Sequence, residues 1–443
     1  MPVCVSLAAQ QERRDFPQLQ YAAIVYDIQQ HSGQRLMRIT IVGGGIIGLC
    51  AAVALLVDGH AVTLVDADHT RSAASWGNAG HLATEQVAPL ASMAAIRSAW
   101  HRRFANGGAL DLPLAQVRTW LPFVPRYVAA SGAARFTAGR HMLAALLEDA
   151  LAGWQRMAAD IGDPGLVRSD GHYVVWESPA TARSGEAAWA AADTGAATLR
   201  HATLDDVKRV AAMMAHMPAG MIRFEGSGQI ANPARLAIAL ESAIRTRGGI
   251  IVRATADLRI ERGEAFVPGF PADLVLLAAG VGSGSLIAGA GHRAPLIAER
   301  GYHIRAAADD WPEDMPPIVF EDRSMIVTRY ADCVQAASFV EFAAINAPPD
   351  RRKWERLERH VRELGLPLAG PFTRWMGARP TLPDYLPAIG RSRRIDNLLY
   401  AFGHQHLGLT LAPVTAGIVA ALARGDMPAI DIAPLAIERF GRG

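Results

Sequence analysis

Three glycines and one aspartate near the front of the chain have the spacing of a nucleotide-phosphate site. Gly43, Gly45 and Gly48 form the pattern G-x-G-x-x-G, directly after the apolar, mostly β-branched run 39–42. The first glycine allows a sharp turn, the second lets a pyrophosphate approach the backbone, and the third lets a helix lie close to the strand. Asp66 follows at the distance where a carboxylate binds a ribose hydroxyl, and it would repel a 2′-phosphate. We expect a dinucleotide site here; the alternative is a glycine-rich turn without a ligand.

The residues around this motif predict a strand, a buried helix and a second strand. The run 39–42 is typical of a buried parallel strand, and 47–57 is apolar nearly all round. Asp58 and Gly59 end that helix with a residue suited to the left-handed conformation, and 62–66 forms the second strand. The free N–H groups at the start of the helix favour an anion such as a phosphate.

Two later segments repeat this strand-and-turn pattern. A buried strand at 274–277 enters a glycine turn at Gly280, and a strand at 398–402 enters the glycine-punctuated turn 403–410 before an apolar helix at 413–422. The small-residue stretch 72–92 leaves the second strand where a ring system would lie. This stretch either brings backbone close to a flat ring or is an ordinary loop.

The rest of the chain predicts a second, interleaved domain. We expect helices over much of 94–159, a strand at 172–176, surface helix over 180–216, antiparallel strands within 299–342 and a charged helix at 353–364. The fold class is therefore α/β: a Rossmann-like dinucleotide-binding domain with an interleaved α+β substrate domain built on an antiparallel sheet. The expected parts are an N-terminal extension at 1–36 that is not part of the fold, the dinucleotide domain at 37–95, 225–295 and 375–443, and the substrate domain at 96–224 and 296–374.

Composition excludes several classes of protein. The chain of 443 residues has 44 basic and 42 acidic residues, so nothing predicts a nucleic-acid partner. The three cysteines have no C-x-x-C spacing, which argues against a metal site or a disulfide framework and favours a reducing compartment, the cytoplasm. No apolar run is long enough to span a bilayer.

One basic cluster has two interpretations. Arg97, His101, Arg102 and Arg103 surround Trp100. Such a cluster is either a solvated helix face or a surface that docks a partner or a membrane, which would place the protein peripherally at the inner membrane face.

From about residue 37 to its end, the chain resembles the D-amino-acid oxidase family of FAD-dependent oxidoreductases. Four motifs occur in family order: the glycine motif with Asp66, the loop SWGNAGH, the strand and turn LLAAGVGS, and the pair WMGARPTLPD and GHQHLGLTLAP. The loop is most similar to that of bacterial D-amino-acid dehydrogenases. The strings ERGYHI, ASFVEFA and GHQHLGLTL resemble the subgroup acting on cis-4-hydroxy-D-proline.

The resemblance implies roles for individual residues. Arg379, in G-x-R-P, would pair with the substrate carboxylate, with Tyr302 and His303 as further substrate contacts and with Tyr302 and His404 as further catalytic candidates. Met325 stands where some oxidases of the family carry a tyrosine, and Tyr302 is the candidate replacement. The FAD contacts would be Gly43, Gly45, Ile46, Ile47, Gly48, Asp66, Ala67, Asn78, Ala79, Gly80, His81, Asp257, Gly280, His404, Gln405, His406, Leu407, Gly408, Leu409 and Thr410.

The expected reaction moves a hydride from Cα of an amino acid to flavin N5. The carboxylate must be fixed so that Cα faces the flavin, and a guanidinium is a planar, bidentate, permanently charged clamp for it. The resemblance points to cis-4-hydroxy-D-proline as the substrate, with a glycine, sarcosine or broad D-amino-acid oxidase as the alternative. A quinone, the respiratory chain or oxygen would accept the electrons. An NAD-dependent dehydrogenase and an RNA-modifying module on the same fold are less well supported, since both later glycine turns converge on one large cofactor and no basic surface domain is evident.

Overall fold

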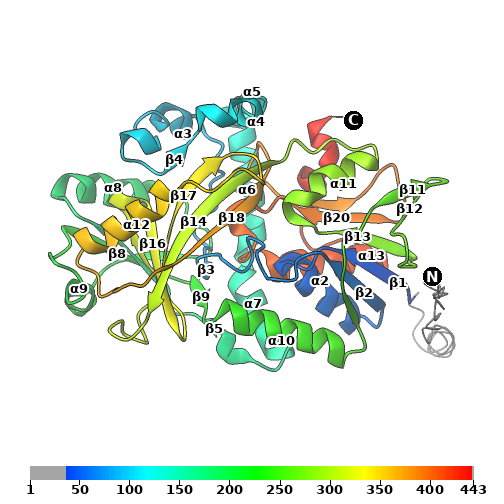
Figure 1. Cartoon of the computed structure of the whole chain (residues 1–443), viewed down its shortest axis with the longest axis horizontal. Helices are drawn as coiled ribbons and strands as arrows, with labels where there is room; N and C mark the ends of the chain where they lie inside the picture. The colour runs from blue at the N-terminus through cyan, green and yellow to red at the C-terminus, as the bar shows by residue number, and fades with distance from the viewer. Residues whose placement is uncertain (1–35, 442–443) are drawn as a thin grey trace, which may run out of the picture. The chain divides into compact units, whose positions relative to one another are not determined.

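The structure is a computed structural model that describes residues 36–441. Most strands of this part of the chain belong to two large sheets (Figure 1). The expectation for residues 1–36 falls, apart from Leu36, outside the described residues. None of the helices among the described residues is long and apolar enough to cross a bilayer.

The first sheet has six strands in the order β10-β2-β1-β13-β20-β19, all parallel to their neighbours except β19, which is antiparallel to β20. Its strands come from three separate stretches of the chain, as in a doubly wound nucleotide-binding sheet. The strands are β1 (Arg38–Val42), β2 (Ala61–Asp66), β10 (Ile250–Arg253), β13 (Leu274–Leu277), β19 (Ala388–Arg391) and β20 (Leu398–Phe402).

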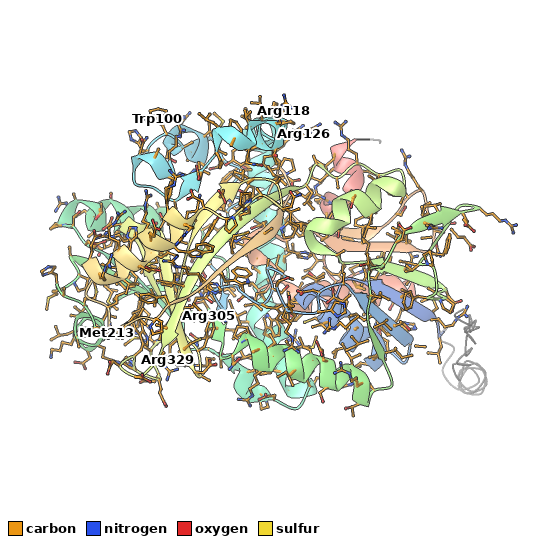
Figure 2. All side chains as sticks on the ribbon, in the orientation of Figure 1. Trp100, Arg118, Arg126, Met213, Arg305 and Arg329 are labelled. Atoms are coloured by element: carbon orange, nitrogen blue, oxygen red, sulfur yellow. The ribbon has the colours of Figure 1, made fainter. Side chains whose placement is uncertain are left out.

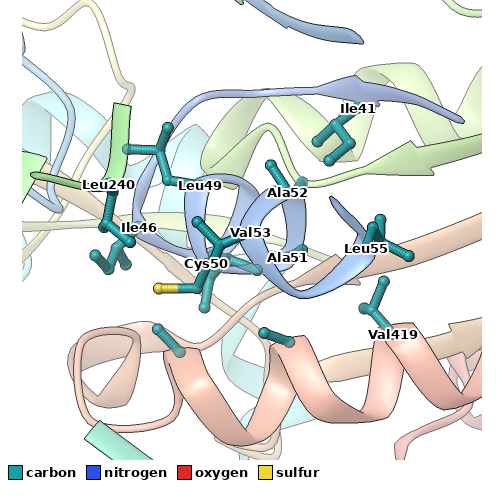
Figure 3. Packing of buried hydrophobic residues seen from close by; sticks show 14 of the residues in the cluster. Ile41, Ile46, Leu49, Cys50, Ala51, Ala52, Val53, Leu55, Leu240 and Val419 are labelled. Carbon is teal, nitrogen blue, oxygen red and sulfur yellow. The ribbon is translucent and has the colours of Figure 1, made fainter. Parts of the chain in front are cut away.

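The helix after the glycine motif, α2 (Ile46–Val57), is buried on almost every side. Two further helices, α10 (Pro233–Thr246) and α13 (Ala412–Arg424), pack against it. Figure 3 shows Leu240 and Val419 of these helices beside the apolar side chains of α2. The absence of a polar face in the sequence therefore reflects a helix enclosed by a sheet and two other helices.

The second sheet has nine strands, eight of them in the order β18-β14-β17-β16-β15-β6-β8-β7, with β4 paired to β17. It is antiparallel except where β15 meets β6 and where β4 meets β17. The strands are β4 (Leu110–Asp111), β6 (His172–Trp176), β7 (Thr198–His201), β8 (Gly220–Glu225), β14 (Ile297–Ala307), β15 (Ile318–Phe320), β16 (Met325–Arg329), β17 (Cys333–Phe342) and β18 (Thr373–Thr381).

Two small sheets complete the strands of the described residues. One has three strands, the first of which lies within the small-residue stretch 72–92. The other is a hairpin of two strands. Their strands are β3 (His81–Leu82), β5 (Val167–Arg168), β9 (Gly228–Ile230), β11 (Arg259–Glu261) and β12 (Glu264–Phe266).

Helices cover the outer faces and fill the connections. The Asn232 side chain caps α10 by accepting from the N–H groups of Ala234 and Arg235, as the Asn-Pro pair predicted. The remaining α-helices are α3 (Met93–Ser98), α4 (Val117–Trp120), α5 (Val124–Ala130), α6 (Ala133–Glu148), α7 (Ala150–Asp160), α8 (Pro179–Ala191), α9 (Leu204–Ala211), α11 (Ser283–Gly289) and α12 (Arg351–Glu363).

One expected element is wrong. The stretch 180–216 is not continuous helix, because β7 lies between α8 and α9 and forms an edge strand of the nine-stranded sheet. The alternation of apolar and polar residues in a four-residue strand is too short to be recognised beside the alanine-rich helix pattern that precedes it. The boundaries of the two interleaved domains stay a prediction.

The close approach of α2 to β1 supplies a test of the glycine motif. A Cβ at Gly48 would lie 1.9 Å from the Gly43 carbonyl oxygen, whereas a Cβ at Gly417, an exposed helical glycine of α13, would meet no atom within 4 Å. We expect Gly48→Ala to lower the free energy of unfolding by about 1–3 kcal/mol or more. Gly417→Ala should raise it by about 0.5–1 kcal/mol through helix propensity.

Denaturant unfolding of the two variants beside the wild type measures both effects. Equal stability of Gly48→Ala and the wild type would contradict the close contact described for this turn.

Candidate active site

A cavity of about 1260 Å³ lies between the two sheets. It is larger than the usual 300–1,000 Å³ of a small-molecule pocket, as a dinucleotide together with a substrate requires. Its walls come from the carboxyl ends of β1, β2 and β13, from the loop 72–79, and from β14, β17 and β18 of the second sheet. The carboxyl edge of a parallel sheet is where ligands bind in open α/β folds.

The glycine motif forms one end of this cavity. Gly43 has a φ of +111°, and a Cβ there would lie 2.5 Å from the Ala278 carbonyl oxygen, so a side chain is excluded. No side chain of its own first turn caps α2; its first N–H, that of Ile46, donates to Ser75 Oγ at 3.0 Å. The end of the helix therefore presents backbone N–H groups at the cavity wall, where a phosphate is favoured.

Asp66 lies where the second strand ends, as predicted. Its carboxylate accepts from Arg253 Nη1 at 2.7 Å, and Arg253 also donates to Glu241 at 2.6 Å. A Cβ at Gly44 would lie 2.7 Å from Asp66 Oδ2, so the turn and the carboxylate pack directly together. Arg253 fixes this carboxylate at the edge of the cavity.

The loop 72–80 is held in place by polar side chains of the second sheet. His303 Nδ1 lies 2.9 Å from the Gly77 carbonyl oxygen, and Tyr330 Oη and Gln335 Nε2 donate to the Asn78 carbonyl at 2.9 and 2.8 Å. Within the loop, Asn78 Oδ1 accepts from Gly80 N at 2.6 Å. The backbone that faces the cavity is therefore rigidly positioned.

The turn after β20 brings the buried His404 and the half-buried His406 to the cavity. His404 Nε2 lies 3.0 Å from Thr415 Oγ1, and burial lowers the pKa of His404 to about 3. His406 Nε2 lies 2.5 Å from Gln86 Oε1, and burial is the main cause that lowers the pKa of His406 to about 4. Because the Gln86 amide oxygen only accepts, His406 donates from Nε2 and keeps Nδ1 as an acceptor, which has no protein partner.

Arg379 reaches the cavity from β18, paired across the strands with Glu299 of β14. Arg379 Nη1 donates to Glu299 Oε1 at 2.7 Å, and its side chain keeps 25% of its area exposed. Glu299 is 1% exposed and also accepts from Thr381 Oγ1 and Tyr385 Oη, at 3.1 and 2.9 Å. The pair thus holds one side of the guanidinium and leaves part of it accessible.

Two features of the backbone make room for this guanidinium. A Cβ at Gly301 would lie 2.2 Å from Arg379 Nη2, so a glycine is needed at this position to leave space for the guanidinium. Phe339 has a φ of +75°, rare for an aromatic residue, and its carbonyl lies 3.4 Å from both Nη atoms of Arg379. Strained backbone of this kind is typical of functional sites.

The hydroxyl of Tyr302 is occupied by protein partners, and the expected substrate and catalytic roles of Tyr302 stay a prediction. Although Tyr302 borders the cavity, its hydroxyl donates to Glu341 at 2.5 Å and accepts from Arg300 Nη2 and Asp350 N at 3.0 and 3.2 Å. These bonds use the full capacity of a phenol, which has one donor and two acceptor sites. The ring packs against Trp354 of α12, on the side of the sheet away from Glu299.

His303 of β14 does not line the cavity, and its side chain contacts the loop 72–80. Its ring stacks on Trp375 at 4.9 Å, and burial lowers its pKa to about 3, so the neutral ring donates to the Gly77 carbonyl. The Asp257 side chain is exposed and paired with Arg259, and Thr255 and Ala256 line the cavity just before it, so the role of Asp257 as a cofactor contact stays a prediction.

Most of the predicted cofactor residues meet at the cavity. Gly48, Gly80, Leu407 and Thr410 do not line it and act through packing or loop hydrogen bonds. The predicted residues that line it are Gly43, Gly45, Ile46, Ile47, Asp66, Ala67, Asn78, Ala79, His81, Gly280, His404, Gln405, His406, Gly408, Leu409, Tyr302 and Arg379.

Several cavity residues were missed because no local pattern marks them. Glu299, Phe339 and Tyr385 depend on strand pairing or backbone conformation. Apolar residues from the connections before α6 line the cavity wall above Arg379; they include Leu110, Leu112, Trp120, Phe123 and Tyr127. The ERGYHI string contains Glu299, but its pairing with Arg379 depends on two strands that lie far apart in the chain.

The fold and the cavity fit a dinucleotide-binding protein whose cavity also presents a partly exposed guanidinium, that of Arg379. The residues at the cavity fit FAD. The glycine turn and the start of α2 suit the pyrophosphate, and Asp66 suits a ribose. The buried Nδ1 atoms of His81 and His406, beside the cavity, have no hydrogen-bond partner among the described residues. The family model of the FAD-dependent oxidoreductases called DAO matches residues 38–422. The chain belongs to this family of FAD-dependent enzymes.

Curated relatives cover nearly the whole chain. A D-amino-acid oxidase of Bradyrhizobium diazoefficiens is 29% identical over 418 residues, which are 91% of this chain and 98% of the relative. A D-amino acid dehydrogenase of Cereibacter sphaeroides is 29% identical, covering 91% of this chain and 95% of the relative. Among solved structures, glycine oxidase from Geobacillus kaustophilus has a TM-score of 0.68 at 19% identity, covering 91% of this chain and 99% of that one. This likeness shows that the fold is shared.

The buried histidines predict a loss of stability in acid. His303 and His404 have pKa values of about 3 in the folded protein, against 6.5 in the unfolded chain. Below about pH 6.5 the unfolded chain binds protons that these folded histidines do not, so stability falls as the pH drops from about 6.5 toward 3. Thermal unfolding followed between pH 8 and pH 4 measures the decline.

The variant His303→Gln isolates the contribution of His303 to the loss of stability in acid. Glutamine can donate to the Gly77 carbonyl without titrating. The melting temperature of this variant should therefore fall less between pH 7 and pH 4 than that of the wild type. An identical acid decline in the two proteins would contradict a neutral, buried His303.

Proposed function

We propose that this chain oxidises a D-amino acid to the imine, with Arg379 binding the substrate carboxylate. The observation that carries the proposal is the partly exposed guanidinium of Arg379, held by Glu299 at 2.7 Å in a cavity whose other end is shaped for a dinucleotide. FAD, when bound, supplies the acceptor for the hydride that leaves Cα. The names of the two curated relatives support an amino-acid substrate of the D series.

Arg379 would position the substrate rather than take part in proton transfer. A guanidinium gripped on one side by a buried carboxylate and a carbonyl has a fixed orientation, so little conformational freedom is lost when a carboxylate binds. Fixing the carboxylate also fixes Cα relative to the cofactor, which is how positioning lowers a barrier. Tyr302 and His303 have other partners and are not part of this proposal.

The cavity wall favours a substrate with a carbon ring or side chain over glycine. The side chains of Leu110, Trp120, Phe123 and Phe342 present apolar surface on the same cavity as Arg379. We therefore propose cis-4-hydroxy-D-proline as the first substrate to test, and a glycine-type, sarcosine-type or broad D-amino-acid oxidase as the second candidate.

The electron acceptor and the compartment belong to the same proposal. A quinone, the respiratory chain or oxygen would reoxidise the enzyme. The two cysteines of the described residues, Cys50 and Cys333, are unpaired, which supports a reducing compartment such as the cytoplasm.

Anaerobic reduction tests the substrate class. The purified holoenzyme is mixed without oxygen with cis-4-hydroxy-D-proline, D-proline, other D-amino acids, glycine and sarcosine, and bleaching of the flavin absorbance is followed. Air is then admitted. Rapid return of the absorbance identifies an oxidase, and slow return identifies a dehydrogenase. Reduction by none of the amino acids would overturn the proposal.

Arg379→Ala should remove the carboxylate clamp while FAD stays bound. Loss of a charge-assisted contact from a partly desolvated site costs about 2–5 kcal/mol, so kcat/KM should fall by roughly 30- to 5000-fold. Arg379→Lys should recover only part of this, because an ammonium does not reproduce the planar fork. Steady-state kinetics with the best substrate, alongside flavin absorbance, measure both variants.

Arg374→Ala is the matched control, since Arg374 lies on the same strand but is exposed and paired with Glu358. Its kinetics should equal those of the wild type. Unchanged kinetics in a flavin-loaded Arg379→Ala protein would show that another group binds the carboxylate.

A further inference from the structure

The segment 90–135, named here the roof segment, has an unusual outer surface. Six of its side chains are large, apolar and exposed: Leu90, Met93, Trp100, Leu114, Leu121 and Val128, with exposed fractions from 41% to 79%. A soluble monomer rarely gathers such side chains on one short stretch without a use for them. Figure 2 shows Trp100, Arg118 and Arg126 at the edge of the molecule occupied by α3, α4 and α5 in Figure 1.

The charge of the roof segment is strongly one-sided. It contains six arginines, at positions 97, 102, 103, 118, 126 and 135, and one acidic residue, Asp111. None of the six arginines forms an ion pair within the described residues, and Asp111 is bound to the buried Lys353 Nζ at 2.7 Å. The whole chain has a net charge of only +2, so positive charge is concentrated here.

The inner side of the same segment closes the cavity. Ile96, Ala99, Arg102, Trp120, Val124 and Tyr127 line it. Leu90 and Val128 also line the cavity, whereas Met93, Trp100, Leu114 and Leu121 do not. These four apolar side chains form, with exposed arginines such as Arg97 and Arg118, an outer surface of the segment that is separate from the cavity lining.

We propose that the roof segment docks the enzyme on a lipid bilayer that contains anionic phospholipids. Apolar side chains such as Trp100 enter the headgroup region while the arginines pair with lipid phosphates, the combination that distinguishes interfacial membrane binding. A nucleic acid would use the arginines but not the four exposed apolar side chains outside the cavity, Met93, Trp100, Leu114 and Leu121. The proposal goes beyond the reaction assigned above and is tested without a substrate.

Co-sedimentation with vesicles tests the docking. The FAD-loaded enzyme should bind vesicles of equal parts phosphatidylcholine and phosphatidylglycerol, bind phosphatidylcholine vesicles far less, and be released by salt. The triple variant Arg97→Glu, Arg118→Glu, Arg126→Glu should lower partitioning to the anionic vesicles by at least roughly 100-fold. The triple variant Trp100→Ser, Leu114→Ser, Leu121→Ser should lower it by roughly tenfold or more.

A matched control reverses the same number of charges elsewhere. Arg183, Arg245 and Arg259 are exposed arginines of α8, α10 and β11, and their change to glutamate should alter partitioning by less than about threefold. All variants should keep their flavin and their turnover with a soluble dye, which controls for folding. Absence of binding, equal binding to neutral and anionic vesicles, or an equal loss in the control variant would each overturn the proposal.

Discussion

The buried carboxylate of Glu299 ties together the parts of the chain that meet at the cavity. It binds Arg379 and Thr381 of the neighbouring strand and Tyr385 of the segment that leads into the other sheet. An ionised carboxylate that is 1% exposed is stable only when its partners replace water. Loss of one partner from such a pair costs about 3–5 kcal/mol, so the strand register and the turn at Tyr385 are constrained together.

The same rule, that buried polar groups need partners, explains how side chains of the second sheet shape the cavity wall at the loop 72–80. The loop 72–80 is rich in small residues and cannot anchor itself through a core. Its carbonyls at Gly77 and Asn78 are instead bound by His303, Tyr330 and Gln335. The cavity wall at this loop is thus shaped by side chains of the second sheet, and neither sheet forms the cavity alone.

Local patterns predicted the parts of the site that local geometry determines. The glycine turn, α2 and Asp66 follow from backbone requirements within about 30 residues, and Arg379 lies in a marked motif. Tyr302 and His303 illustrate what a sequence cannot decide. They are consecutive on β14 and so point to opposite faces, but both faces of this strand are buried and no alternation shows which one meets the ligand. Glu299 was missed because its role depends on pairing with a residue eighty positions away.

The ionisation of the cavity bears on how the substrate amine loses its proton. Burial lowers the pKa values of His404 and His406 to about 3 and about 4, so neither is a useful base near neutral pH. This argues against His404 as an acid–base catalyst and favours a hydrogen-bonding role for it and for His406. The guanidinium of Arg379 lines the same cavity, and a guanidinium does not accept protons. In the oxidation proposed above, the protein's contribution would therefore lie in the position and electrostatics that the Arg379–Glu299 pair supplies.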